Sequence, residues 1–359
     1  MQNEKAVTLI LEDGHVFHGF SFGFEKPVSG EVVFSTAMTG YVESLTDPSY
    51  NGQILAITFP LVGNYGVPQA SFDAQGLSSF YESEKVQVRA LVVGDYSYDY
   101  SHWNASRSLA DWLKEEQVVG IHGVDTRELT KVLREKGAMK AKIVFDTPEE
   151  IDFEDTQALN LASEVSCAEV KSYGQGTKKL CVVDCGVTHN LLRTLSGYDV
   201  EITRVPWNHD FNADAVAYDG LLISNGPGNP ELCSETIEHV RQFMQSGKPI
   251  CGVGLGHQIL ALAAGAKVEK LKAGHRGHNQ PVRMVGSNKC VITAQNHGYA
   301  VVGASLPADW KELFVSMNDG SNEGIRHESK TWISTQFVPE TAGGTTDTRF
   351  VFEEFFAAL

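Results

Sequence analysis

The stretch ICGVGLGHQ, residues 250–258, runs from apolar residues into a turn with glycines at positions 252, 254 and 256. A strand that turns sharply into a helix through closely spaced glycines is typical of the turn that presents a catalytic nucleophile in α/β enzymes. The helix that follows would offer unpaired backbone N–H groups in its first turn, where they stabilise developing negative charge. The tip of this turn, however, is Gly254, which has no side chain that could react.

Nearby residues do not replace the missing nucleophile. Cys251 lies three residues before Gly254, and two such residues of a strand are ~10 Å apart and on opposite faces. His257 follows the turn, while His275 and His297 are expected in neighbouring loops. Each histidine could at best act as a base on water. Neutral histidines packed in polar loops are the more common alternative.

Composition limits the class of protein. The chain has 359 residues, 42% of them hydrophobic, and a formal net charge of −16. This is globular composition, and the length favours two domains. An acidic surface repels phosphate backbones, so nucleic acid is not an expected partner. The sequence shows neither a ~20-residue apolar run nor a signal-peptide pattern, so we expect a cytoplasmic protein with no membrane association.

The cysteines predict neither a metal site nor disulfides. Six are dispersed along the chain, and no CxxC pair occurs. A zinc site or a disulfide framework would need regular cysteine spacing or an oxidising compartment. We therefore expect reduced thiols, most of them buried in strands, and no metal site.

The pattern of elements divides the chain into two α/β domains. Residues 1–150 combine short strands, turns and a few helices, among them a hairpin that turns at Asp13–Gly14 and a helix from Asp125 or Thr126 to Gly137. Residues 151–177 are acidic or polar and are expected to be a linker. Residues 178–359 alternate strands and helices, which predicts a mostly parallel sheet covered on both faces. Functional loops are then expected at the carboxyl ends of its strands, in SNGPGNP, GVGLGHQ and TAQNHGYA.

The second domain carries several further motifs whose order along the chain is informative. SNGPGNP, GLGHQILALAAGAK, GHRGHNQPV, QNHGYAV, NEGIRHES and TQFVPE occur in this order. Together they resemble the class I, triad-type glutamine amidotransferases, which implies a flavodoxin-like fold. The first domain adds GEVVFSTAMTGYVESLTDPSYNGQI and GIHGVDTRELTKVLREKG. With these motifs, nearly the whole chain resembles the small, glutaminase subunit of carbamoyl-phosphate synthetase.

This resemblance implies a defined chemistry. In the family, a cysteine at the turn attacks the amide of glutamine, a histidine serves as base and acid, and a glutamate orients the histidine. The released ammonia passes to a large subunit, where it meets bicarbonate activated by ATP and carbamoyl phosphate results. The implied partner is therefore a large subunit that carries the ATP and divalent-metal sites, with no cofactor in this chain.

Most of the glutamine-binding positions of the family match. By resemblance, these residues would hold the carboxylate, ammonium and amide groups of glutamine. The alternative is that the glycines only form turns and that the asparagine caps a loop. The matching residues are Ser49, Gly226, Gly228, Leu255, Gln258, Asn296, Gly298 and Tyr299.

The catalytic positions do not match. Gly254 stands at the position of the family's cysteine, Val338 stands at that of its histidine, and only Glu340 is retained. Thr188 stands where the family commonly has a lysine. We therefore expect a small subunit with an inactive glutaminase site, in a structural, regulatory or ammonia-dependent role. Two alternatives stay open: a glutamine-binding sensor module, and a conventional glutaminase subunit inactivated by engineering.

Overall fold

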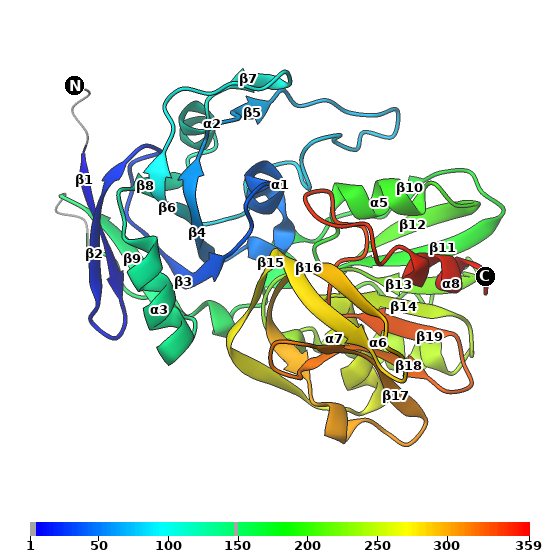
Figure 1. Cartoon of the computed structure of the whole chain (residues 1–359). Coiled ribbons are helices and arrows are strands. Elements are labelled where there is room, and N and C mark those ends of the chain that lie inside the picture. Colours follow the sequence, from blue (N-terminus) through cyan, green and yellow to red (C-terminus); the bar gives the residue numbers. More distant parts are fainter. Residues whose placement is uncertain (1–4, 147–149) are drawn as a thin grey trace. The chain divides into compact units, whose positions relative to one another are not determined.

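The chain forms two compact units. The computed structural model describes residues 5–146 and 150–359. The first unit extends to Phe72 and includes Ser78–Ala158, and the second consists of Asp73–Leu77 and Leu159–Leu359 (Figure 1). Two parts of the sequence-based predictions lie outside the described residues: the start of the N-terminal stretch (1–4) and the start of the weakly patterned segment before residue 178 (147–149).

A closed barrel forms the body of the first unit, with strand order β1-β2-β8-β6-β4-β3-β9. In β9, Met139, Ala141, Ile143 and Phe145 are buried and alternate with more exposed residues, as a strand with one face in a core requires. The barrel strands are Ala6–Leu11 (β1), Val16–Ser21 (β2), Val28–Ser35 (β3), Gln53–Val62 (β4), Ala90–Tyr96 (β6), Val119–His122 (β8) and Met139–Phe145 (β9). Val67–Pro68 (β5) and Ala105–Arg107 (β7) form a separate two-stranded sheet.

Local sequence signals of the first unit are confirmed. Strands β1 and β2 pair as the expected antiparallel hairpin. The side chain of Asp125 accepts a hydrogen bond from the N–H of Glu128 at the start of α3, and Gly137 ends that helix. The helices of this unit are Tyr41–Thr46 (α1), Leu109–Glu115 (α2) and Thr126–Lys136 (α3).

The second unit contains one large mixed sheet. Its parallel part has the order β12-β11-β13-β14-β19, and the antiparallel strands β18, β17, β15 and β16 extend it beyond β19. The short strand β10 pairs antiparallel with β12. The strands are Lys171–Tyr173 (β10), Lys178–Asp184 (β11), Val200–Pro206 (β12), Gly220–Ile223 (β13), Ile250–Val253 (β14), Val268–Met284 (β15), Cys290–Val301 (β16), Trp310–Ser316 (β17), Asn322–His327 (β18) and Trp332–Thr335 (β19).

One expected loop is corrected. TAQNHGYA lies inside β16, which pairs antiparallel with β15, and His275 and His297 therefore lie in strands and not in loops. Its sequence does not alternate cleanly between apolar and polar residues, because many of its polar side chains are themselves buried.

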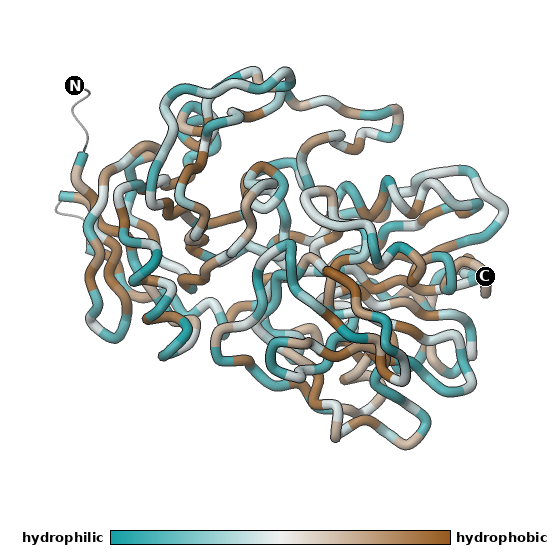
Figure 2. The backbone as a smooth tube through the Cα atoms, viewed as in Figure 1, coloured by the Kyte–Doolittle hydropathy of each residue, from teal (hydrophilic) through white to brown (hydrophobic). Residues whose placement is uncertain are grey.

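Helices cover both faces of this sheet. Because neighbouring residues of a strand point to opposite faces, Val183 of β11 packs in one apolar cluster with Ile259 of α7, and Val182 packs in the other with Leu192 of α5. Figure 2 shows apolar residues concentrated along the strands. The helices are Leu161–Val165 (α4), His189–Leu195 (α5), Ser234–Met244 (α6), Leu255–Ala264 (α7) and Phe350–Phe356 (α8).

The strand order brings three loops together. Strands β13, β14 and β19 are parallel neighbours, so the loops at their carboxyl ends meet at one edge of the sheet, where sites of α/β folds are found. Within the described ranges, the helices are too short or too polar to cross a membrane.

Candidate active site

Gly254 forms the whole turn between β14 and α7. The strand ends at Val253 and the helix begins at Leu255. Gly254 has φ 57° and ψ −112°, a left-handed φ that strains residues with a side chain. Its N–H donates to the carbonyl oxygen of Thr335 in β19 at 2.8 Å. The sharp turn that the glycine spacing predicts is therefore present, and its tip is held against the neighbouring strand.

The three glycines of this turn have different roles. A Cβ on Gly256 would lie 2.1 Å from the carbonyl oxygen of Ile223, and one on Gly252 would lie 2.6 Å from that of Gly256. Neither position admits a side chain, because α7 packs too closely on β13 and β14. A Cβ on Gly254 would lie 3.1 Å from the Cβ of Asn225, a tight contact that small shifts relieve. Of the three positions, Gly254 is where an added Cβ meets the least steric conflict, although the positive φ still strains a residue with a side chain.

Val338 and Glu340 follow β19 in the adjacent loop. Val338 pairs with Ala294 of β16, to whose carbonyl oxygen its N–H donates at 3.0 Å. Glu340 is 1% exposed, and its Oε1 accepts a hydrogen bond from the hydroxyl of Thr188 at 3.5 Å. The backbone carbonyl of Glu340 accepts from the side-chain amide of Asn190.

The contact between Thr188 and Glu340 is a feature that the sequence alone did not predict. The Thr188 hydroxyl oxygen also accepts from the N–H of Leu191 and caps α5. A threonine at this position therefore joins a helix cap to a buried carboxylate 152 residues further along the chain. The sequence showed that Thr188 stands where the family commonly has a lysine. The fold was needed to show that Thr188 faces Glu340.

The loop after β13 lies against the turn. A Cβ on Gly226 would lie 2.0 Å from the carbonyl oxygen of Cys185 and 3.0 Å from Cδ2 of Leu255. Gly228 has φ 90°, and a Cβ there would lie 3.3 Å from Leu161. Two of the predicted glutamine-binding residues, Gly226 and Leu255, are thus neighbours.

Gln258 connects two further predicted segments. Its Nε2 donates to the carbonyl oxygen of Tyr299 at 3.0 Å and to Oε1 of Gln336 at 2.9 Å. Asn296 lies in the same part of β16, beside Gly298, and the N and O atoms of its side-chain amide are buried without a hydrogen-bond partner among the described residues. An amide in that condition is costly unless a ligand or water satisfies it.

Ser49 belongs to the other unit. It lies in the short 3-10 helix Pro48–Tyr50, where its N–H donates to the carboxylate of Asp47 at 2.8 Å. It is buried and belongs to the first unit, while the other predicted glutamine-binding residues belong to the second.

The nearby sulfur and imidazole groups are poorly suited to catalysis. Cys251 is fully buried, and burial raises the pKa of its thiol far above the usual value. His257 is also fully buried, with Nδ1 2.8 Å from the hydroxyl oxygen of Ser334. Burial lowers the pKa of His257 to about 3, so this ring is neutral near pH 7.

The six cysteines are free thiols, but the expectation that most are buried in strands is wrong. Cys181 and Cys251 are buried in strands, Cys185 and Cys233 are buried outside strands, and Cys290 is exposed.

Comparison with known proteins decides the family. The family description "Carbamoyl-phosphate synthase small chain, CPSase domain" matches residues 9–143, and "Glutamine amidotransferase class-I" matches residues 181–358. The arginine-specific small chain of carbamoyl phosphate synthase from Neosartorya fischeri is 46% identical over 354 residues, which cover 96% of this chain and 78% of the relative. The chain belongs to the carbamoyl-phosphate synthase small-chain family.

Other members of this family are much longer proteins. Mitochondrial carbamoyl-phosphate synthase [ammonia] of Homo sapiens is 48% identical over 355 residues, which cover 98% of this chain and 23% of that protein. The multifunctional protein CAD of Squalus acanthias is 48% identical over 353 residues, covering 97% of this chain and 16% of that protein. The chain spans less than a quarter of the length of these two relatives.

Family membership assigns the two units. The small-chain CPSase domain falls on the barrel unit, and the class I amidotransferase domain falls on the unit with the large sheet. The α/β, flavodoxin-like class expected for the second domain is thereby confirmed.

Proposed function

We propose that this chain is a carbamoyl-phosphate synthase small subunit whose own glutaminase site is inactive. One observation carries the proposal: the tip of the turn between β14 and α7 is Gly254, held in the conformation in which a nucleophile would be presented. Glycine offers no atom for covalent catalysis, and losing the nucleophile costs about as much as losing the whole catalytic set.

A second position supports the same conclusion. Val338, at the position of the family's histidine, can neither accept nor donate a proton. Glu340, the family's orienting glutamate by resemblance, is buried and accepts a hydrogen bond from the hydroxyl of Thr188. A glutamate that orients an imidazole has no imidazole to orient at position 338.

Neither His257 nor Cys251 is suited to replace the missing base or nucleophile. A general base must accept a proton near the working pH, and a pKa of about 3 leaves His257 a very weak base. Cys251 remains a protonated thiol among apolar side chains. We therefore propose that this subunit acts with a large subunit supplied with free ammonia, in a structural or regulatory role. The name of the human relative, a synthase of the ammonia type, supports this role.

The direct test is glutamine hydrolysis by the purified full chain. We expect glutamate release no faster than in a protein-free sample, and no covalent adduct of glutamine detectable by mass spectrometry. Adding a large synthase subunit with ATP and bicarbonate should give carbamoyl phosphate from ammonium but not from glutamine. Glutamine-dependent turnover that saturates with substrate would overturn the proposal.

A glutamine-binding role without hydrolysis is the second candidate. The amide of Asn296, unpartnered among the described residues and three residues before the Tyr299 that Gln258 bonds, favours it, because glutamine would satisfy that amide. A ligand that binds one state of the subunit better would shift its equilibrium with a partner. Calorimetry with glutamine separates the candidates: binding weaker than millimolar would remove the sensor role and leave the structural one.

A further inference from the structure

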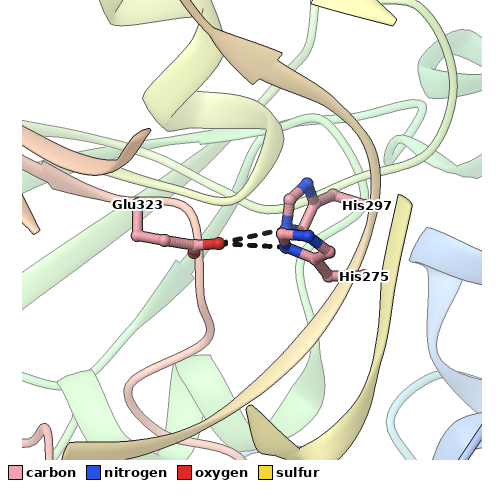
Figure 3. Close-up of side chains that lie close together, drawn as sticks. All are labelled: His275, His297 and Glu323. Carbon is pink, nitrogen blue, oxygen red and sulfur yellow. Dashed lines mark hydrogen bonds and ion pairs between the residues drawn. The ribbon is translucent and has the colours of Figure 1, made fainter. Parts of the chain in front are cut away.

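Three metal-ligating side chains converge in the antiparallel part of the large sheet. His275 of β15, His297 of β16 and Glu323 of β18 point toward one another (Figure 3). Nδ1 of His275 lies 3.1 Å and Nε2 of His297 lies 3.8 Å from the same carboxylate oxygen of Glu323. One ligand atom from each residue lies within 4.8 Å of the others.

The remote nitrogens of both rings face atoms that only accept hydrogen bonds. Nε2 of His275 lies 2.9 Å from a carboxylate oxygen of Asp319, and Nδ1 of His297 lies 2.8 Å from the carbonyl oxygen of Tyr299. The carbonyl of Tyr299 places the proton of His297 on Nδ1. Both nitrogens of His275 face carboxylate oxygens, Asp319 at Nε2 and Glu323 at Nδ1, so a neutral ring with its proton on Nε2 is one of the two states that fit this geometry, beside the doubly protonated ring. With the protons of the neutral rings on these nitrogens, the other nitrogens present lone pairs, and both of those lone pairs face Glu323.

The surroundings add more acceptor atoms. The side-chain N of Gln295 donates to the second oxygen of Glu323 at 3.0 Å, which leaves the Gln295 amide oxygen 3.2 Å from Nε2 of His297. Glu323 has no exposed surface, and the side chains of His275 and His297 are 11% and 5% exposed. Buried lone pairs and a buried carboxylate aimed at one point are costly unless a cation lies between them.

We propose that His275, His297 and Glu323 bind a divalent metal ion of the zinc type. Two imidazole nitrogens and one carboxylate oxygen suit such an ion, and ligands bonded at ~2.0–2.1 Å in a tetrahedron lie ~3.3–3.5 Å apart. The distances of 3.1 and 3.8 Å to Glu323 fall on either side of that range. Asp319 and the Tyr299 carbonyl would hold the rings, as outer partners of metal-bound histidines do.

The sequence-based expectation of no metal site rested on cysteine spacing alone. Histidine and glutamate ligands from three different strands leave no such spacing pattern. The bound ion would join β15, β16 and β18 and would fix the segment of β16 around His297. A second proton on His275, which would donate to both Asp319 and Glu323, is the competing explanation for the cluster, and metal binding separates the two.

The test uses the full chain without an affinity tag. The protein is stripped with a chelator, dialysed into metal-free buffer and titrated with Zn²⁺ by calorimetry, and bound zinc is counted by mass spectrometry. We expect one Zn²⁺ per chain. Glu323→Gln should weaken binding at least ~100-fold, and Asp319→Asn, which loses an outer partner, should weaken it ~10-fold.

Two variants serve as controls. Glu328→Gln changes an exposed glutamate paired with Lys311, and Cys290→Ser removes the exposed thiol, which could bind zinc by itself. Both should bind one Zn²⁺ as the unchanged chain does. Absence of tight zinc binding by the unchanged chain, or equal binding by Glu323→Gln and Glu328→Gln, would overturn the proposal and leave the protonated histidine.

Discussion

The turn at Gly254 follows β14, which lies in the same sheet as the paired strands β15 and β16. The two regions differ in their side chains. At the turn, the backbone has the form that presents a nucleophile, while the reactive atoms are absent. Around β15 and β16, polar side chains are dense, buried and aimed at one another. Gly252 and Gly256 are required by the packing of α7, whatever residue 254 is. Packing therefore maintains the form of this turn independently of the residue at its tip.

The largest effect is expected from restoring both missing side chains. Combined Gly254→Cys and Val338→His substitutions should raise glutamate release at least ~10³-fold above either single variant, because nucleophile and base act as a unit. The measurement is glutamate release over time, with mass spectrometry for a covalent intermediate. The expected gain also depends on the proposed glutamine-binding residues beside the turn, among them Gln258 and Asn296.

The single variants are the controls for this experiment. Each should remain near the background rate, and each must be folded by circular dichroism. A folded double variant that stays at background would show that the proposed glutamine-binding residues no longer support hydrolysis. In that case, the contrast between the turn and the polar side chains of β16 is wrong.

The second effect concerns the histidine next to the turn. The folded state keeps His257 neutral down to about pH 3, whereas the unfolded chain takes up a proton below about 6.5. Unfolding therefore becomes easier as the pH falls from 6.5 toward 3. The cost is about 2 kcal/mol by pH 5, at ~1.4 kcal/mol per pH unit. Urea unfolding at pH 7.5 and pH 5 should show this loss in the unchanged chain.

A variant isolates the contribution of this ring. His257→Gln should lose about 2 kcal/mol less than the unchanged chain between the two pH values. Equal pH dependence of His257→Gln and the unchanged chain would mean that His257 titrates normally. It would then again be a candidate base beside the turn.

The sequence predicted local structure better than it predicted contacts between distant strands. The Asp125 cap, the hairpin at Asp13–Gly14 and the turn at Gly254 each depend on a few adjacent residues. Closure of the barrel depends on pairs such as Leu9 with Ile143, which no local pattern encodes. The close spacing of the three glycines around Gly254 predicted the tight turn from local sequence, whereas the glutamine-binding positions came from the family resemblance and stay a prediction.

The side-chain contacts of the site were not predictable in this way. Thr188 meets Glu340, and His275 meets Glu323, only after strands distant in sequence have paired. The assignment of residues 293–300 to a loop failed because the buried polar side chains of β16 hide the alternation that marks a strand.

A third effect is expected from placing alanine at the two glycines that flank α7, which tests how well the turn accepts a side chain. Gly254 and Gly265 flank α7, both with positive φ. A Cβ meets nothing within 4 Å at Gly265 but meets Asn225 at 3.1 Å at Gly254. Gly265→Ala should cost ~1–2 kcal/mol for the left-handed conformation, and Gly254→Ala should cost more, because its ψ of −112° lies outside the left-handed helical region and its Cβ also meets Asn225. Chemical denaturation measures both, and equal losses would show that neither this ψ nor Asn225 resists the added Cβ.

The smallest effect on stability is expected at Asn296. Its amide is buried without a partner among the described residues, and such a group costs ~1–3 kcal/mol, which offsets the packing lost on truncation. Asn296→Ala should therefore change the free energy of unfolding by less than ~1 kcal/mol, while glutamine binding measured by calorimetry is lost. Gln295→Ala is the matched control, because its amide bonds Glu323 and Thr293 and its loss should destabilise by ~1–3 kcal/mol. If the two variants lose equal stability, Asn296 serves the fold and not a ligand. The turn at Gly254 and the polar side chains of β16 would then not differ in ligand binding.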